Sequence, residues 1–156
     1  MRSQDIITLL RQRFAAPAFA FLTGVANGTG GVRVRTADAI AMSVWPSRGL
    51  RLHGFEVKVS RSDWKRELEN PAKAESVCTF CDHWWIAAPD GVVERSELPP
   101  TWGLLEADKK KLKTTVQAPE LIATPISRRR MARSRIVLAK VMPMPPDGAL
   151  RCRSAR

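Results

Sequence analysis

Hydrophobic residues recur at two different spacings along the first part of the chain. Apolar residues between Ile6 and Phe14 follow helical spacing and Pro17 ends the pattern, which predicts a helix over residues 3–14. Three apolar stretches follow, and we interpret them as strands because they are short and bounded by Gly, Asn or Pro. The predicted strands cover residues 18–26, 33–45 and 50–59, with a hairpin turn at 27–31.

The spacing returns to that of a helix after residue 60. Ser62 is a candidate helix cap, and Trp64 and Leu68 fit one face of the helix that follows. The remaining predicted elements are a second helix from Pro71 to about Cys81, a buried strand over residues 83–89, an extended link over residues 98–103 and an edge strand over residues 114–117.

Three consecutive strands, a helix and a fourth strand predict an α/β fold. Only a crossover connection can return the chain parallel to a neighbouring strand, so we expect a mixed central sheet flanked by helices. At 156 residues the chain is long enough for about one domain.

Positive charge is concentrated at the C-terminal end. The chain has 26 Lys and Arg against 15 Asp and Glu, a net charge of +11, and the whole excess lies in residues 109–156. We therefore expect a core domain over residues 1–108 and a basic extension over 109–156, with a helix at 127–141 and a loose tail. Such a layout is typical of proteins that bind DNA, because basic side chains neutralise phosphates. The alternative is a tail that aids solubility or meets a membrane surface.

Several classes of protein are not expected. The chain has no apolar run of the 18 or more residues that a membrane span needs, and its three cysteines do not favour a disulfide framework, so we expect a cytoplasmic protein without a membrane partner. Cys78 and Cys81 precede His83, but no second cysteine pair completes a zinc site or a four-cysteine iron–sulfur cluster. We therefore expect neither zinc nor an iron–sulfur cluster.

Charged residues within the predicted strands are the candidates for chemistry. Side chains alternate along a strand, so Glu56 and Lys58 share one face, while Asp38 interrupts an otherwise apolar strand. If these two strands pair, Asp38 and Glu56 converge, and two adjacent carboxylates are stabilised by a hard cation such as Mg²⁺. The alternative is a structural ion pair between Glu56 and Lys58, with Asp38 at a strand end.

The sequence around these residues resembles a known nuclease superfamily. The stretches 35–42, 56–64 and 81–89 are similar to an MmcB-like, phage and bacterial DNA-repair-associated branch of the PD-(D/E)XK, or restriction-endonuclease-like, nucleases. The resemblance covers about residues 3–106. It implies a restriction-endonuclease-like core of the order α-β-β-β-α-β.

The resemblance also implies roles for individual residues. Asp38 and Glu56 would bind Mg²⁺ or Mn²⁺ together with the carbonyl of Val57. Lys58 would orient or help deprotonate the attacking water and offset charge on the phosphate. Many such nucleases bring a Glu from the first helix to the metal, whereas this helix has Asp5, which is a candidate to replace it.

Further side chains are expected to contact DNA. The five tryptophans are candidates for stacking on bases, with packing in the core as the favoured alternative. For Arg61 and Lys73 the alternative is a solvated helix face. The expected phosphate contacts are Arg35, Ser60, Arg61 and Lys73 in the core, and Arg128, Arg129, Arg130, Arg133 and Arg135 in the extension.

The sequence therefore predicts a Mg²⁺-dependent or Mn²⁺-dependent deoxyribonuclease, with endonuclease favoured over exonuclease. Its expected setting is DNA repair, recombination or phage DNA processing. A non-catalytic DNA-binding accessory module with the same fold is the main alternative, and a basic adaptor for acidic partners is a weaker one. Whether the active form is a homodimer stays open.

Overall fold

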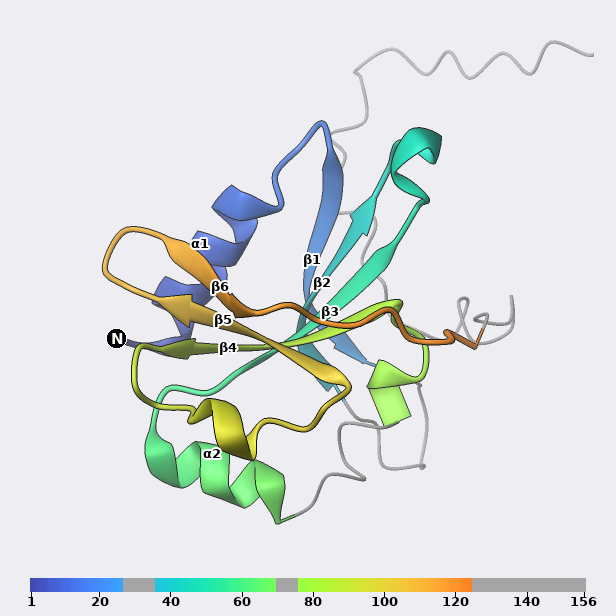
Figure 1. Ribbon diagram of the computed structural model, residues 1–156. Coiled ribbons are helices and arrows are strands. Elements are labelled where there is room, and N and C mark those ends of the chain that lie inside the picture. Colours follow the sequence, from blue (N-terminus) through green and yellow to red (C-terminus); the bar gives the residue numbers. More distant parts are fainter. Residues whose placement is uncertain (27–35, 70–75, 125–156) are drawn as a thin grey trace, which may run out of the picture.

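A computed structural model describes residues 1–26, 36–69 and 76–124 (Figure 1). The helices and strands are α1 (Ser3–Arg13), β1 (Phe19–Ala26), β2 (Thr36–Ser43), the 3₁₀ turn η1 (Pro46–Arg48), β3 (Leu52–Val57), α2 (Arg61–Leu68), β4 (His83–Pro89), the 3₁₀ turn η2 (Arg95–Glu97), β5 (Trp102–Ala107) and β6 (Leu112–Val116). None of these described helices has the length and apolar character needed to cross a membrane.

The six strands form one mixed sheet in the order β1-β2-β3-β4-β5-β6. The pairs β3–β4 and β4–β5 are parallel, and the other pairs are antiparallel. Helix α2 lies in the crossover from β3 to β4, which is why these strands run parallel. The mixed α/β fold predicted from the sequence is confirmed at this level.

A hydrophobic core lies on each face of the sheet. Helix α1 covers one face, where Ile6 and Leu10 pack with Phe55 and Trp85. Helix α2 covers the other face, where its Trp64 belongs to a second core (Figure 1). That second core also contains Trp84, Ile86, Trp102 and Leu104.

Gly54 on β3 is required by this packing. A Cβ atom at this position would lie 2.5 Å from the ring of Trp84 on the neighbouring strand and 2.7 Å from the sulfur of Cys81. Any side chain here would force the buried indole to move, and close packing leaves little room for that.

The last two strands of the sheet, β5 and β6, differ from the elements predicted from the sequence. The extended link predicted over 98–103 leads directly into β5, a strand that the sequence did not reveal. Its side chains are buried on both faces of the sheet, so it lacks the alternation that identifies a half-exposed strand. Strand β6 lies at Leu112–Val116, so the sheet continues past the expected core boundary at residue 108.

The start of α2 also differs from the start predicted from the sequence. The helix begins at Arg61 and its cap is Ser60, whose hydroxyl accepts the Asp63 amide at 3.3 Å, whereas Ser62 was the predicted cap. Other predicted features lie outside the described residues. They are the hairpin turn at 27–31, the first residues of the strand at 33–45, the start of the helix at Pro71 and the helix at 127–141.

Candidate functional site

Strands β2 and β3 stop pairing at the position of the predicted carboxylate pair. Their ladder ends where Ala39 faces Phe55, although β3 continues to Val57. The amide of Val57 donates instead to the Asp38 carboxylate, with 2.8 Å between nitrogen and Oδ2. The carbonyl of Val57 points to the same side of the strand as its amide, toward Asp38. The Asp38 carboxylate is thus fixed where the two strands separate, on the side of β3 to which the Val57 carbonyl also points.

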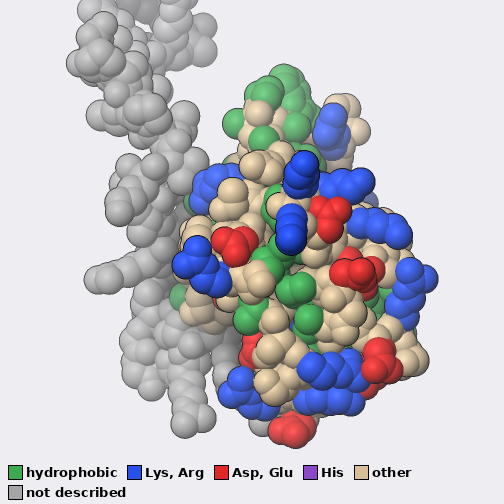
Figure 2. Space-filling view, turned by 90° about the vertical axis from the view of Figure 1, so that its left-hand side faces the viewer, with side chains coloured by type: hydrophobic (Ala, Val, Ile, Leu, Met, Phe, Trp, Pro, Cys, Tyr) green, Lys and Arg blue, Asp and Glu red, His purple; other side chains and the backbone are tan. Residues whose placement is uncertain are grey.

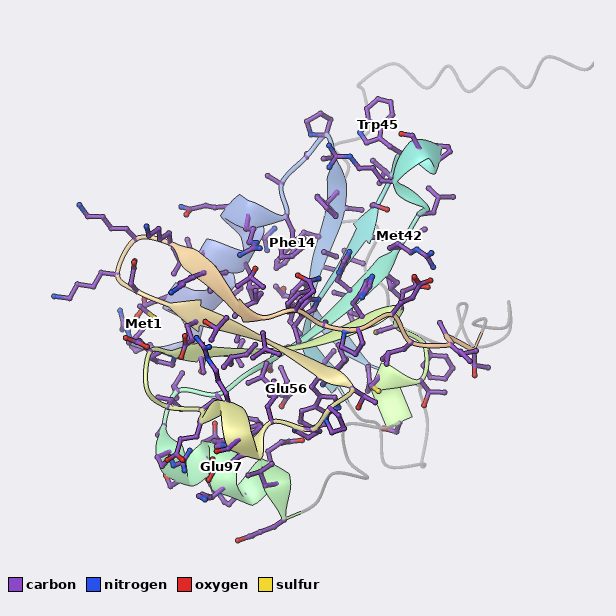
Figure 3. All side chains as sticks on the ribbon, viewed as in Figure 1. Met1, Phe14, Met42, Trp45, Glu56 and Glu97 are labelled. Atoms are coloured by element: carbon purple, nitrogen blue, oxygen red, sulfur yellow. The ribbon has the colours of Figure 1, made fainter. Side chains whose placement is uncertain are left out.

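Glu56 and Lys58 share one face of the sheet, as the strand alternation predicted, and α2 covers that face. Phe55 and Val57 point into the core beneath α1. The Lys58 ammonium lies 2.9 Å from Oε1 of Glu56, and its side chain is only 8% exposed. Figure 3 shows Glu56 between the sheet and α2. The structure therefore brings Asp38, Glu56 and Lys58 together from two adjacent strands.

A third carboxylate in this cluster was missed in the sequence. Oε2 of Glu67 on α2 lies 2.8 Å from the Lys58 ammonium, and the Glu67 side chain is 12% exposed. Acidic residues on helices usually face solvent, so the residue type alone does not identify Glu67 as part of a buried cluster. The sequence does contain one signal for Glu67. It follows the buried Trp64 by three residues, and this spacing places both side chains on the inward face of the helix.

The cluster holds more negative than positive charge. Burial and the neighbouring Asp38 raise the pKa of Glu56 to about 7, although Lys58 opposes the shift. Burial raises the pKa of Asp38 as well, against the hydrogen bond from the Val57 amide. Burial lowers the pKa of Lys58, but Glu56 and Glu67 outweigh it, so the net shift is upward. Lys58 is therefore an ammonium at neutral pH, and its environment favours a charge-stabilising role over that of a base.

The oxygen atoms of this cluster are suitable ligands for a hard divalent cation. The carboxylates of Asp38 and Glu56 and the carbonyl of Val57 are oxygen ligands of the kind that Mg²⁺ and Mn²⁺ prefer. Among the described residues, no group of three His, Cys, Asp or Glu side chains could hold a metal by itself. Two carboxylates and a carbonyl would leave the remaining positions to water, as is usual for Mg²⁺.

Asp5 has a structural partner. Its carboxylate accepts the amide of Arg2 at 2.7 Å and caps α1, which covers the opposite face of the sheet from Glu56 and Lys58. The carboxylate that joins Asp38 and Glu56 in the cluster is that of Glu67 on α2, which contacts Lys58.

Two of the side chains expected to contact DNA, those of Arg61 and Ser60, contact other groups of the protein. Arg61 lies 2.9 Å from the carboxylate of Glu94 and 2.6 Å from that of Glu97, so its guanidinium joins α2 to the η2 turn. Ser60 caps α2. The other expected contacts lie outside the described residues, namely Arg35, Lys73, Arg128, Arg129, Arg130, Arg133 and Arg135.

The two cysteines of the motif belong to the core on the α2 face, where Cys81 is buried and Cys78 is partly buried. Cys81 is fully buried, and its thiol donates to the carbonyl of Val77 at 3.7 Å. Burial raises the pKa of this thiol to about 12, so it is not a thiolate at neutral pH.

We predict that the stability contributed by Glu56 falls as the pH rises. The folded state holds the proton of Glu56 up to about pH 7, whereas the unfolded chain releases it near 4.5. This contribution to the free energy of unfolding should therefore fall by about 3 kcal/mol between pH 4.5 and pH 7 in EDTA. Burial lowers the pKa of His53 to about 4, which adds an opposite slope in the same range. The Glu56 contribution is therefore measured as the difference in urea unfolding between the wild type and Glu56→Gln.

Two variants define this measurement. The free energy of unfolding of Glu56→Gln, taken relative to the wild type, should rise by about 3 kcal/mol between pH 4.5 and pH 7, because the neutral amide does not titrate. Glu69→Gln, at an exposed position at the end of α2, should follow the wild type. The same pH dependence in Glu56→Gln and the wild type would contradict the raised pKa of Glu56.

Comparison with known proteins supports the fold alone. Neither a protein-family model nor a curated protein sequence matches the chain. A solved structure, the SPO1766 protein of unknown function from Silicibacter pomeroyi, is similar with a TM-score of 0.63 and 22% sequence identity. The match covers 85% of this chain and 81% of that one. The two proteins share a fold over most of their length.

Proposed function

We propose that the chain is a metal-dependent DNA nuclease with a restriction-endonuclease-like core. Its setting would be DNA repair, recombination or phage DNA processing, and internal cleavage is favoured over cleavage from ends. The observation that carries this proposal is the meeting of Asp38, Glu56 and Lys58 where β2 and β3 separate, with the Val57 amide fixing the Asp38 carboxylate. The basic extension supplies the attraction for DNA.

The cluster needs a cation before it can accept a phosphodiester. Glu56 and Glu67 pair with the ammonium of Lys58 and Asp38 adds a third carboxylate nearby, so a phosphate would meet net negative charge. Asp38, Glu56 and the Val57 carbonyl would hold Mg²⁺ or Mn²⁺, and the bound ion would polarise the phosphate and lower the pKa of its water. Activity should therefore require a divalent ion.

Lys58 would stabilise the charge that develops on the phosphate. Its ammonium is already oriented by two carboxylates and is shielded from water, so little reorganisation is needed when it donates to a phosphate oxygen. Glu67 on α2 would hold the ammonium in position if Glu56 turns toward the cation. The role of Glu67 is therefore one of positioning.

We predict that the protein binds Mn²⁺ at this site in the absence of DNA. Isothermal titration should give one ion per chain, and Asp38→Asn or Glu56→Gln should weaken the affinity at least about tenfold, because each removes a charged ligand. Asp90→Asn, which changes a residue in the turn after β4, is the matched control and should bind normally. Equal Mn²⁺ affinity in all four proteins would place the ion elsewhere.

A non-catalytic DNA-binding module is the second candidate. The observation that favours it is the pairing of Lys58 with two carboxylates, which satisfies the cluster without any ion. This candidate predicts DNA binding that neither needs Mn²⁺ nor leads to cleavage. The Mn²⁺ titration and the cleavage assay together separate the two functions.

A further inference from the structure

The five tryptophans have very different environments. Four of them are buried in the two cores, with exposed fractions of 5% or less, and they are Trp64, Trp84, Trp85 and Trp102. Trp45 is 50% exposed and lies in the connection between β2 and β3, at the far end of β2 from Asp38 (Figure 3). The structure thus singles out one tryptophan that can meet a ligand.

Trp45 belongs to an apolar tip formed by the β2–β3 connection. Met42, Val44 and Leu50 are also exposed, by 41%, 44% and 44%. Figure 2 shows hydrophobic side chains (green) at the upper end of the molecule, with Lys and Arg side chains (blue) beside them. Figure 1 places both η1 and the α1–β1 connection at that end. All four residues lie in or beside the β2–β3 connection, at one end of the sheet.

The backbone of the apolar tip is held by hydrogen bonds. The buried hydroxyl of Ser43 accepts the Arg51 amide at 2.8 Å, and the Arg48 amide donates to the Trp45 carbonyl at 2.9 Å. Gly49 has a φ of +75° and Leu50 a φ of +51°. A bulky residue rarely adopts a positive φ, and such backbone conformations concentrate at functional sites. The indole is therefore presented on an ordered turn.

The charge at the apolar tip is positive. Arg48 is exposed, and no ion pair holds its guanidinium within the part of the chain that the structure describes. The neighbouring Arg51 pairs with Asp82 at 3.3 Å and with Glu120 at 2.5 Å, so the free positive charge at the tip is that of Arg48 among the residues described there. An aromatic face beside a cation suits a nucleobase and its phosphate.

We propose that Trp45 stacks on an unpaired base of bound DNA while Arg48 contacts the adjoining phosphate. This inference rests on the proposed function, since it assumes that the protein binds DNA. Trp45 follows Asp38 by seven residues and lies just past the end of β2, roughly 23 Å away at the rise of extended chain, so the stacked base lies several nucleotides from the bond to be cut. The preferred substrate would then contain a single-stranded segment. A second copy of the chain is disfavoured as the occupant, because a stable interface needs about 800 Å² on each partner.

The test measures binding of the full-length protein to a 20-nucleotide oligothymidylate and to a duplex of equal length, both in EDTA. Trp45→Ala should weaken binding to the single strand by about 5- to 150-fold, the effect of losing one base–aromatic stack, and Trp45→Phe should retain most of it. The slope of log affinity against log salt should stay unchanged in both Trp45 variants. In Arg48→Ala it should flatten by about 0.7, the value for one phosphate contact on a single strand.

Fluorescence and a matched variant provide the controls. The single strand should quench tryptophan emission in the wild type and not in Trp45→Phe, because the four remaining indoles are buried. Ile122→Ala removes a fully exposed apolar residue that does not belong to the β2–β3 connection and should bind the single strand normally. Normal binding by Trp45→Ala would overturn the inference while leaving the proposed function intact.

Other occupants would give different results. Trp45-dependent binding to vesicles of anionic lipid, or Trp45-dependent dimerisation in sedimentation, with unchanged single-strand affinity, would also overturn the inference. If the wild type bound neither DNA, the proposed function itself would fail.

Discussion

Asp38→Asn and Glu56→Gln are each expected to reduce cation-dependent DNA cleavage by about 10³-fold or more. Both carboxylates would hold the same ion, so losing either removes the charge that lets a phosphate approach. Lys58→Ala should reduce the rate by on the order of 10²-fold, the effect typical of one preorganised donor. DNA affinity in EDTA should stay the same or rise in the two carboxylate variants, because each removes negative charge near the phosphate.

The cleavage measurement uses single-turnover rates with excess protein, and circular dichroism checks that each variant is folded. Glu69→Gln is the control, since this residue is exposed at the end of α2 and Lys58 pairs with Glu56 and Glu67 instead. Full activity in Asp38→Asn, Glu56→Gln or Lys58→Ala would rule out the site.

Reversing five charges in the basic extension is expected to produce the other large effect. Changing Arg128, Arg129, Arg130, Arg133 and Arg135 to Glu should weaken duplex binding by at least about 10²-fold near 0.1 M salt, because the extension carries the whole net charge of +11. The slope of log affinity against log salt should flatten by about 0.9 for each phosphate that the extension no longer neutralises.

Cleavage by the charge-reversed protein should persist at high protein concentration, since the carboxylate cluster lies in the core. Replacing the same five residues with Lys is the matched control and should preserve both affinity and slope. If charge reversal left affinity and slope unchanged, the extension would serve a protein partner or solubility, and the core surface would hold the DNA.

Much of the fold could be predicted from the sequence where the pattern was regular. Clear apolar spacing identified helix α1, strands β1, β2 and β3, and strand β4, and turn residues marked where these strands end. Strand β5 was not recognised, since both its faces are covered and its pattern has no period. The cap of α2 was misplaced by two residues, because Ser60 and Ser62 are both suitable caps and only the backbone decides which one accepts the Asp63 amide.

The candidate site was predictable only in part. The alternation of β3 places Glu56 and Lys58 on one face, and a hairpin brings Asp38 beside them. Glu67 depends on how α2 packs against the sheet, which local sequence does not specify. The partners of Arg61 were equally hidden in the sequence: Glu94 and Glu97, which hold its guanidinium, come from a turn more than thirty residues away.

Hydrolysis of phosphodiester bonds in DNA by the cluster of Asp38, Glu56 and Lys58 can be tested directly. The measurement incubates the wild-type protein and Glu56→Gln with linear, circular, single-stranded and junction DNA, each in Mg²⁺, Mn²⁺ or EDTA. We expect the wild type to cut at least one of these DNAs in Mg²⁺ or Mn²⁺, with no cutting in EDTA or by Glu56→Gln. Absence of cutting in every condition, or equal cutting by Glu56→Gln, would contradict the proposed activity.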